Sequence, residues 1–286
     1  MANLKEIRNR IASVSSTMQI TSAMKMVSAA KLKKAQDAIT AMRPYANKLT
    51  ELLQSLSATL DADTGSKFSA QREVKKVLLV AITSNRGLCG AFNSNIIKEV
   101  NKIATQKYSN QQVFYLTIGK KANDAFKKTN RVIANKSHVF DDLTFDNVAE
   151  IAQLLMDKFV EGEFDKIEIV YNSFRNAATQ DIMVEQFLPI VPIESNTNMN
   201  LDYIFEPSKV EIVEQLIPKS LKTQLYKSIR DSFASEHGAR MTAMHKATDN
   251  ATELRDQLKL TYNKARQAAI TNEILEIVGG AEALNG

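Results

Sequence analysis

The residues best suited by type to do chemistry lie in one glycine-containing turn, SNRGLCGAFN, at residues 84–93. The turn follows an apolar run and precedes an expected helix, and the N-terminus of a helix presents free N–H groups that bind phosphate. Its spacing, however, matches neither GxxxxGK[ST] nor GxGxxG. Gly87 and Gly90 therefore need only turn a tight corner, which argues against nucleotide binding by this chain.

The cysteine and the histidines do not form a catalytic or metal-binding pattern. Cys89 is the only cysteine, which excludes an internal disulfide framework and fits a reducing compartment. No histidine lies near it in sequence to act as a base, so a small packed thiol is the better reading. His138, His237 and His245 lack metal-ligand spacing. We expect no catalytic residue, metal or cofactor, and single out Arg86 as a partner for an acidic group on another chain.

The elements that would position this turn begin with a very long C-terminal helix. From Pro218 to Val278 the chain has no further proline and one internal glycine, Gly238, so it could form a single helix roughly 90 Å long, ended by the glycines at 279–280. Its second half spaces core-type residues three and four apart, as in a coiled-coil seam. The seam positions are Met244, Ala247, Ala251, Leu254, Leu258, Thr261, Ala265, Ala268, Asn272 and Leu275.

The N-terminus supplies a matching helix. Asn3 and Glu6 have capping-box spacing, and the same three-four pattern continues over about 40 residues. We expect the two terminal helices to form an intramolecular antiparallel coiled coil; the alternative is that each packs separately on a globular core. The N-terminal seam positions are Leu4, Ile7, Ile11, Val14, Met18, Thr21, Lys25, Ser28, Leu32, Ala35, Ile39 and Met42.

Part of the N-terminal helix is more apolar than one seam requires. Between Ile20 and Ala30, small and apolar side chains surround most of the helix, and a helix apolar all round is normally buried all round. The segment therefore runs inside a sleeve of other chains, or is covered by its own domain. Further along, Arg43-Pro44 is expected to kink or split the helix.

The middle of the chain predicts an α/β domain. Residues 77–82 are a continuous apolar run, typical of a strand buried on both faces of a parallel sheet. We expect five further elements after this strand, in the following order: a helix at 93–108, a strand at 113–118, a short helix at 122–128, a weak edge strand within 131–140, and a helix capped by Thr144 or Asp146. Two alternating runs, 167–171 and 182–187, suggest a hairpin at a sheet edge. A short helical run then precedes Pro218, which suits the first turn of the long helix.

Charge is unevenly distributed along the chain. The net charge is +5; residues 1–60 hold nine basic and three acidic residues, and residues 218–278 hold ten and seven. Residues 61–217 instead hold eighteen basic against twenty-one acidic residues. Because the basic residues of the helices are interleaved with apolar ones and lack aromatic stacking partners, an acidic protein surface fits them better than nucleic acid.

The motifs together resemble a known family. The N-terminal run LKEIRNRIASVSSTMQITSAMKMVSAAKLKKAQ, the turn SNRGLCGAFN and the C-terminal run from SEHGARMTAMHKATDN to EILEIVGGAEAL are similar to the gamma subunit of the F-type ATP synthase. The resemblance spans both ends and the middle. One departure is Asn85, where the family usually has aspartate; this removes a charge and puts any acid-mediated contact there in doubt.

The resemblance implies a non-catalytic rotor shaft. Its fold would be a long antiparallel coiled coil (1–60 and 208–286) plus a central Rossmann-like α/β domain (74–200). The coiled coil would stand in a ring of alternating catalytic and non-catalytic subunits, one copy per complex. The lower part would contact the epsilon subunit and the membrane rotor ring, and rotation would couple proton flow to ATP synthesis or hydrolysis. With no organellar presequence and no spanning segment, the expected place is the cytoplasmic face of a bacterial inner membrane, as a peripheral protein.

Partner-contact residues follow from the resemblance position by position. Met24, Lys25 and Arg240 would face acidic lever loops of catalytic subunits, Arg266 and Gln267 a loop nearer the top of the ring, and Ile274 and Ile277 a hydrophobic bearing. Asp202 and Tyr203 would belong to the foot that meets epsilon and the rotor ring. The competing hypotheses are an α/β nucleotide-binding enzyme with an appended helical hairpin, and a coiled coil that binds nucleic acid.

Overall fold

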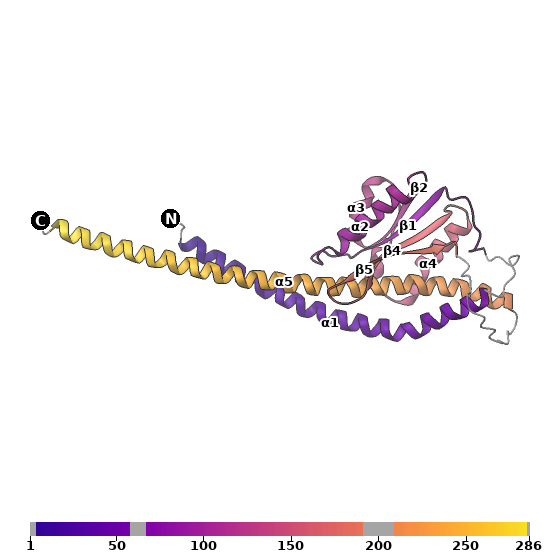
Figure 1. Cartoon of the computed structure of the whole chain (residues 1–286), viewed down its shortest axis with the longest axis horizontal. Helices are drawn as coiled ribbons and strands as arrows, with labels where there is room; N and C mark the ends of the chain where they lie inside the picture. The colour runs from indigo at the N-terminus through magenta and orange to yellow at the C-terminus, as the bar shows by residue number, and fades with distance from the viewer. Residues whose placement is uncertain (1–3, 58–66, 191–208, 285–286) are drawn as a thin grey trace. The chain divides into compact units, whose positions relative to one another are not determined.

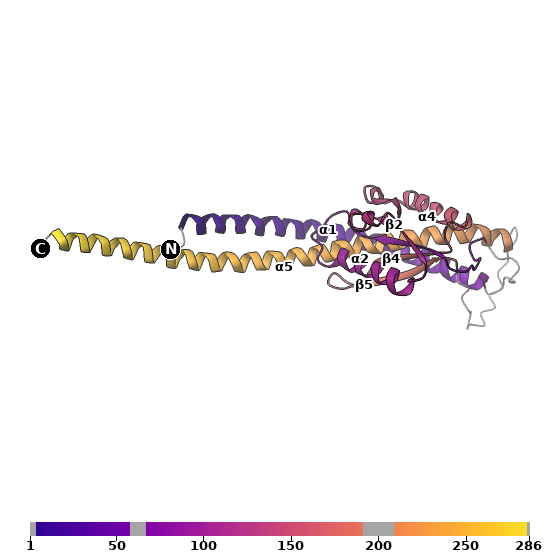
Figure 2. The ribbon, with the colours of Figure 1, turned by 90° about the horizontal axis from the view of Figure 1, so that it is seen from above.

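The computed structural model describes residues 4–57, 67–190 and 209–284, and its residues divide into two units. Unit 1 comprises residues 1–28 and 241–286, and unit 2 comprises residues 29–240. Two helices, α1 (Leu4–Ser57) and α5 (Lys209–Leu284), run through both units. Figures 1 and 2 show these helices and the sheet from two directions. Each unit is described by itself below.

Unit 2 is built on a five-stranded sheet in the order β3-β2-β1-β4-β5. The strands are β1 (Lys76–Ile82), β2 (Gln112–Ile118), β3 (Val132–Asn135), β4 (Lys166–Phe174) and β5 (Gln180–Leu188). The first four strands in this order are parallel, and β5 pairs antiparallel with β4. The predicted buried central strand, the β3 edge and the hairpin at the opposite edge are all confirmed.

Helices cover both faces of the sheet. On one face lie α2 (Phe92–Lys102), which continues as a π-helix (η2, Ile103–Lys107), and α3 (Lys120–Phe126), which continues as a 3-10 turn (η3, Lys127–Thr129). A second 3-10 turn, η4 (Ser137–Phe140), follows β3. On the other face lies α4 (Phe145–Val160), whose N-cap Thr144 accepts a hydrogen bond from the Asn147 backbone N–H. The α5 residues Ile217, Leu221, Leu225 and Ile229 join the same core.

The central strand carries the greatest burial. All six residues from Val77 to Ile82 are fully buried, because β1 has parallel neighbours on both sides and helices above and below. Alternate residues enter the two cores: Leu78, Val80 and Ile82 face α4, and Val77, Leu79 and Ala81 face α2. At roughly 1.5–3 kcal/mol per buried aliphatic side chain, this strand anchors the domain.

Two glycines of unit 2 lie where a Cβ would come unusually close to backbone atoms. Gly119 follows β2 with φ +115, and a Cβ there would lie 2.2 Å from the Thr83 carbonyl oxygen. Gly238 lies inside α5, and a Cβ there would come within 3.2 Å of the Ala177 Cα in the β4–β5 turn. The one internal glycine of the long helix therefore lets a hairpin approach it closely.

The terminal helices pair antiparallel, as predicted. Every predicted seam residue of α1 from Leu4 to Met42 is buried or half-buried, while most other α1 positions are exposed. Within unit 1 the Thr248 hydroxyl donates to the Thr21 hydroxyl at 2.8 Å, and the Thr252 hydroxyl contacts the Met18 sulfur at 3.3 Å. These contacts fix the register of the pair.

The α5 seam is covered over only part of its predicted length. Since Thr248 contacts Thr21 and the helices are antiparallel, the start of α1 at Leu4 lies near Ala265. Past Ala265, the exposed seam positions are Ala268, Asn272 and Leu275, and only Ala269 is half-buried among the later residues described. Up to Ala265, the buried or half-buried seam positions are Met244, Ala247, Ala251, Leu258 and Ala265, whereas Leu254 and Thr261 are exposed.

Two of four local expectations were wrong: the start of the long helix at Pro218 and its end at Gly279. The helix α1 is not split at Pro44, which leaves the kink as the remaining expectation there, and α5 begins at Lys209 rather than at Pro218. It also continues past Gly279 and Gly280. Proline removes one backbone hydrogen bond and glycine costs about 1 kcal/mol, which packing on either side can outweigh. The helix expected at 93–108 is present, as α2 up to Lys102 and as a π-helix from Ile103 to Lys107.

Amide hydrogen exchange on the purified chain should separate these regions. We expect slow exchange over 77–82, because opening them requires loss of both cores, and fast exchange over 270–281, where α5 is exposed along every residue. Mass spectrometry of peptic fragments measures both segments in one sample. Equal protection of the two segments would contradict the burial pattern.

Candidate functional site

The glycine turn predicted from sequence lies between β1 and α2 and is closed by its own polar groups. The Asn93 side-chain oxygen accepts a hydrogen bond from the Ser84 backbone N–H at 2.9 Å. Leu88 and Gly90 both adopt positive φ, 62° and 58°, which gives the tight corner expected from the sequence. The Leu88 side chain is 64% exposed. The turn is thus a fixed loop that presents an apolar side chain outward.

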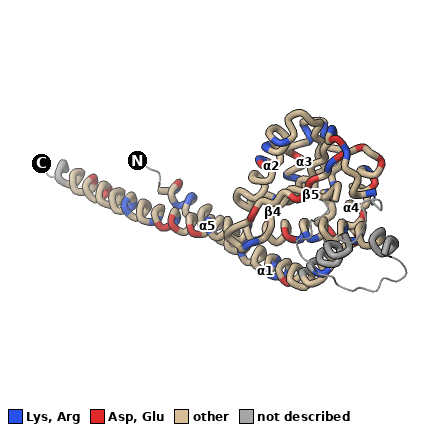
Figure 3. The backbone as a smooth tube through the Cα atoms, turned by 45° about the vertical axis from the view of Figure 1, so that its right-hand side comes forward, with Lys and Arg blue, Asp and Glu red and all other residues tan. Residues whose placement is uncertain are grey.

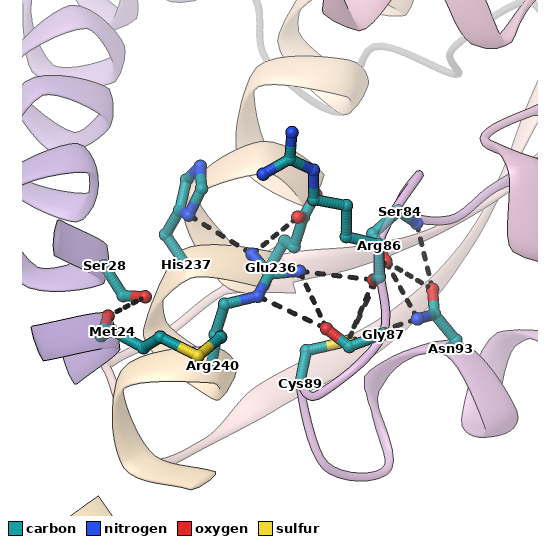
Figure 4. A network of polar contacts seen from close by, with 10 residues as sticks. All are labelled: Met24, Ser28, Ser84, Arg86, Gly87, Cys89, Asn93, Glu236, His237 and Arg240. Atoms are coloured by element: carbon teal, nitrogen blue, oxygen red, sulfur yellow. Dashed lines mark hydrogen bonds and ion pairs between the residues drawn. The ribbon is translucent and has the colours of Figure 1, made fainter. Parts of the chain in front are cut away.

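The guanidinium of Arg240, from α5, anchors this turn (Figure 4). Its NH2 donates to the Arg86 and Gly87 carbonyl oxygens at 3.2 and 3.3 Å, and its Nε donates to the Gly87 oxygen at 3.4 Å. Arg240 is only 7% exposed. Its donors are therefore largely used within unit 2.

A carboxylate neutralises this buried cation. Glu236 Oε1 lies 2.7 Å from Arg240 NH1, one helical turn away on α5. Burial raises the pKa of Glu236, while Arg240 opposes the rise and Lys31 and Arg86 oppose it further. Removing either partner of such a pair would leave a buried charge uncompensated, which typically costs about 3–5 kcal/mol.

His237 completes the cluster from the same helix. Its Nδ1 lies 3.4 Å from Arg240 NH1, and its ring stands edge-on to Phe233 with centroids 4.5 Å apart. Because Arg240 can only donate, Nδ1 accepts and the imidazole is neutral. Burial, with Arg240 and Lys31 adding to it, lowers the pKa of His237 to about 4. Its Nε2 is buried without a hydrogen-bond partner among the residues described.

Cys89 is a packed thiol rather than a nucleophile. It is buried, and the Asn93 side-chain amide donates to its sulfur at 3.1 Å. Burial raises the pKa of the thiol, which keeps it protonated and unreactive near neutral pH.

The Asn85 side chain bridges two segments. Its side-chain oxygen accepts from the Lys120 backbone N–H at 3.0 Å, and its side-chain nitrogen donates to the Ser137 carbonyl oxygen at 3.0 Å. A carboxylate could accept the first bond but could not donate the second. Asparagine here therefore ties the end of β1 to the start of α3 and to the segment after β3.

The structure places the other predicted contact residues in different environments. In unit 1, Met24 and Lys25 are half-exposed on α1, and the Met24 carbonyl accepts from the Ser28 hydroxyl. Arg86 is exposed in unit 2. The exposed contact residues of α5 are Arg266, Gln267, Ile274 and Ile277. Asp202 and Tyr203 lie outside the described residues.

Sequence reasoning missed Glu236 and His237. A signal for Glu236 was present, since SEHGAR places a glutamate four residues before an arginine, the spacing of a helical ion pair. Its burial could not be read from that spacing.

Within the described part of the chain, no group of three or more His, Cys, Asp and Glu side chains could hold a metal ion. No described helix is long and apolar enough to span a bilayer.

A His237→Gln variant should reveal the low pKa of this histidine. The unfolded chain takes up a proton near pH 6.5 and the folded chain only near 4, so wild-type stability falls as pH drops through this window. As the pH drops from 7 to 4, the free energy of unfolding of the wild type should fall by up to about 3 kcal/mol more than that of the variant.

Guanidinium unfolding followed by circular dichroism at several pH values measures this difference. Glu236, His138 and His245 are present in both proteins, so the difference isolates His237. A difference that is flat between pH 7 and 4 would contradict the environment described.

Comparison with known proteins covers the whole chain. A family model described as ATP synthase matches residues 3–284. ATP synthase gamma chains of Flavobacterium psychrophilum and Christiangramia forsetii are 77% and 68% identical to it, each over 100% of both chains.

Solved structures also resemble it. A chain of the Tetrahymena thermophila mitochondrial ATP synthase central stalk/c-ring structure aligns with TM-score 0.61 and 25% identity, over 80% of this chain and 99% of that one. A chain of the Euglena gracilis OSCP/F1/c-ring structure aligns with TM-score 0.68 and 22% identity, over 98% and 94%, and supports the fold. The full-length identities, with a family model that spans nearly every residue, place this chain in the ATP synthase gamma-chain family.

Proposed function

We propose that this chain works as a rotating shaft whose exposed helical surface drives the catalytic subunits around it. Membership of the gamma-chain family makes it the central-stalk subunit of an F-type ATP synthase and a non-catalytic one. The hypothesis of a nucleotide-binding enzyme is therefore wrong. The observation that carries the proposal is the apolar surface that unit 1 leaves uncovered.

Unit 1 exposes large apolar side chains along both of its helices. On α1, Ile20 and Met26 are 60% and 68% exposed, and Val27 lies beside them. Exposed apolar patches of this kind mark surfaces that other chains cover. The exposed apolar residues of α5 in this unit are Leu254, Leu260, Ile270, Ile274, Leu275, Ile277 and Val278.

The proposed partners follow from this surface and from the relatives. A ring of alternating catalytic and non-catalytic subunits would form the sleeve around unit 1, with Ile274 and Ile277 in an apolar bearing and Arg266 and Gln267 against a loop below it. The epsilon subunit and the membrane rotor ring would bind the foot that contains Asp202 and Tyr203. The Tetrahymena structure comprises a central stalk together with a c-ring. One copy per complex would lie at the cytoplasmic face of a bacterial inner membrane.

Asymmetry of this surface is the physical basis of the coupling. A shaft that presents different side chains to each catalytic subunit shifts each subunit towards a different conformation, by the difference in contact free energy. Met24 and Lys25 would meet acidic loops in turn as the shaft rotates. Arg240 is largely enclosed by unit 2, so its contribution to such a contact would come through the turn that it anchors.

Purification of the affinity-tagged chain from its own cells tests the proposal. We expect it to bring down two kinds of large nucleotide-binding subunit, each in three-to-one excess over this chain. A matched control carries charged residues at Ile20 and Val27, two exposed apolar positions of the proposed sleeve contact. Recovery of the wild-type chain without those subunits would overturn the proposal.

Lys25→Glu should uncouple rotation from catalysis without unfolding the chain. Lys25 occupies a seam position but is half-exposed, so its charge can reach a partner surface. Reversal would put like charges in contact at every step, at about 1 kcal/mol each where water is present.

Vesicles reconstituted with the variant complex report ATP synthesis and hydrolysis side by side. We expect synthesis to fall relative to hydrolysis in Lys25→Glu, and Lys25→Ala to be milder because it introduces no repulsion. Wild-type coupling in Lys25→Glu would show that this lysine meets no acidic group.

A further inference from the structure

The sulfur of Met18 differs from the other methionine sulfurs of unit 1 because side chains of a second helix donate hydrogen bonds to it. The Thr252 hydroxyl lies 3.3 Å from this sulfur, and the Arg255 NH1 lies 3.5 Å from it. Met18 belongs to α1 and both donors belong to α5, and all three lie in unit 1. Over residues 4–57, 67–190 and 209–284, no other methionine sulfur accepts a hydrogen bond. A thioether is a weak acceptor, so two donors at one sulfur are more than packing requires.

Asp256 orients the guanidinium of Arg255. One carboxylate oxygen of Asp256 lies 2.9 Å from the Arg255 Nε and 2.8 Å from its NH2, which leaves NH1 to face the Met18 sulfur. Acidic and basic residues both occur along the part of α5 that belongs to unit 1, as Figure 3 shows. This neighbouring pair therefore holds a positive charge at a sulfur atom in the seam of the coiled coil.

A surface hollow gives small molecules access to this sulfur. Its volume is about 400 Å³, many times the roughly 30 Å³ that one molecule of liquid water occupies. Met18 is half-buried. The sulfur can therefore meet a small solute while both donors stay in contact with it. The hollow is lined by Met18, Gln19, Ser22, Ala23, Met26 and Thr248.

We propose that Met18 is a site of oxidation by hydrogen peroxide, at which Thr252 and Arg255 promote the transfer of oxygen to the sulfur. A sulfur lone pair attacks one peroxide oxygen, and the O–O bond breaks with its electrons on the other oxygen. The departing hydroxide takes the proton of the transferred oxygen and leaves as water. Sulfur is oxidised by two electrons to the sulfoxide, and peroxide is reduced by two.

Developing charge explains the role of the two donors. Negative charge builds on the departing oxygen as the O–O bond breaks, and donors already aimed at such charge lower the barrier. Because the donors of Thr252 and Arg255 lie within 3.5 Å of the sulfur, a peroxide in contact with the sulfur is within their reach. The Thr252 hydroxyl also lies 2.9 Å from the Thr248 carbonyl oxygen, so it can turn between that acceptor and the oxidant.

The product would change the pairing of the helices. A sulfoxide is polar where the thioether is apolar, and thiol-dependent reductases return it to methionine. Met18 lies one helical turn from Thr21, whose hydroxyl accepts a hydrogen bond from Thr248 across the pair. Peroxide would therefore act reversibly on the seam at the point where its register is fixed. This inference goes beyond the proposed function, because the chemistry needs only residues of unit 1.

The exposed methionine of the same hollow serves as an internal control. Met26 is 68% exposed, and no described residue donates a hydrogen bond to its sulfur. If exposure alone governed the reaction, Met26 would be oxidised faster than Met18. We expect the opposite order when the purified full-length chain is treated with dilute hydrogen peroxide. Mass spectrometry of peptides, with fragmentation to place the added oxygen, follows the sulfoxide at each position over time.

Two substitutions remove the donors one at a time. Thr252→Val keeps the shape of the side chain without its hydroxyl, and Arg255→Leu removes the cation. Each should slow oxidation of Met18 about tenfold, the factor expected for one hydrogen bond to developing charge, and leave the rate at Met26 unchanged. Thr252→Ser restores the hydroxyl and should react like the wild type.

Circular dichroism of each variant reports whether its helical content matches the wild type. Faster oxidation of Met26 than of Met18 in the wild-type chain would overturn the inference, and so would a wild-type rate at Met18 in both donor variants. The order of the two methionines needs no substitution, so it decides the question even if a variant loses helix.

Discussion

Pairing between the two terminal helices is the constraint on which the rest of the structure depends. The α1 seam is covered at every predicted position, and in unit 2 the same α5 helix contributes Ile217, Leu221, Leu225 and Ile229 to the sheet core. A helix this long cannot be stabilised by propensity alone, so packing along its length must hold it. Where packing stops, past Ala269, α5 remains a helix with its apolar residues exposed. That exposed surface is what the proposed shaft offers to its partners.

Arg240 shows how a residue can matter for a contact without making it. Its guanidinium pairs with Glu236 and donates hydrogen bonds to the carbonyl oxygens of Arg86 and Gly87, so its donors bind the turn and not solvent. Such a buried pair is weak evidence for stability. Its hydrogen bonds to two carbonyl oxygens instead hold the backbone of the turn. Its effect is to hold Arg86 and Leu88 outward. The resemblance to the gamma family predicted Arg240 as a contact residue. In the structure its guanidinium positions the turn, a role that needs no direct contact with a partner.

The sheet domain has its own chemistry, separate from that of the coiled coil. Its carboxyl edge is where α/β folds usually bind small ligands, but here the turn lacks a phosphate-binding pattern and is filled by Asn93, Cys89 and Arg240. What reaches the surface is charge: Arg86, Lys120 and Lys121. An edge whose turn is filled by its own side chains fits a subunit that transmits force and does not carry out a reaction.

The sequence by itself determined the paired terminal helices, the buried strand at 77–82, the hairpin edge and the absence of a phosphate motif, because periodicity and spacing report which faces are buried. It also marked Lys25 and Arg86 as cations of interest. Only the tertiary structure decided that α1 and α5 run through Pro44 and Pro218, since packing on both sides of a proline outweighs one lost hydrogen bond. It alone placed Glu236 and His237 around Arg240, and gathered Arg86, Lys120 and Lys136 at one edge. These residues are up to about 150 positions apart, and local patterns carry no information on which distant segments a sheet brings together.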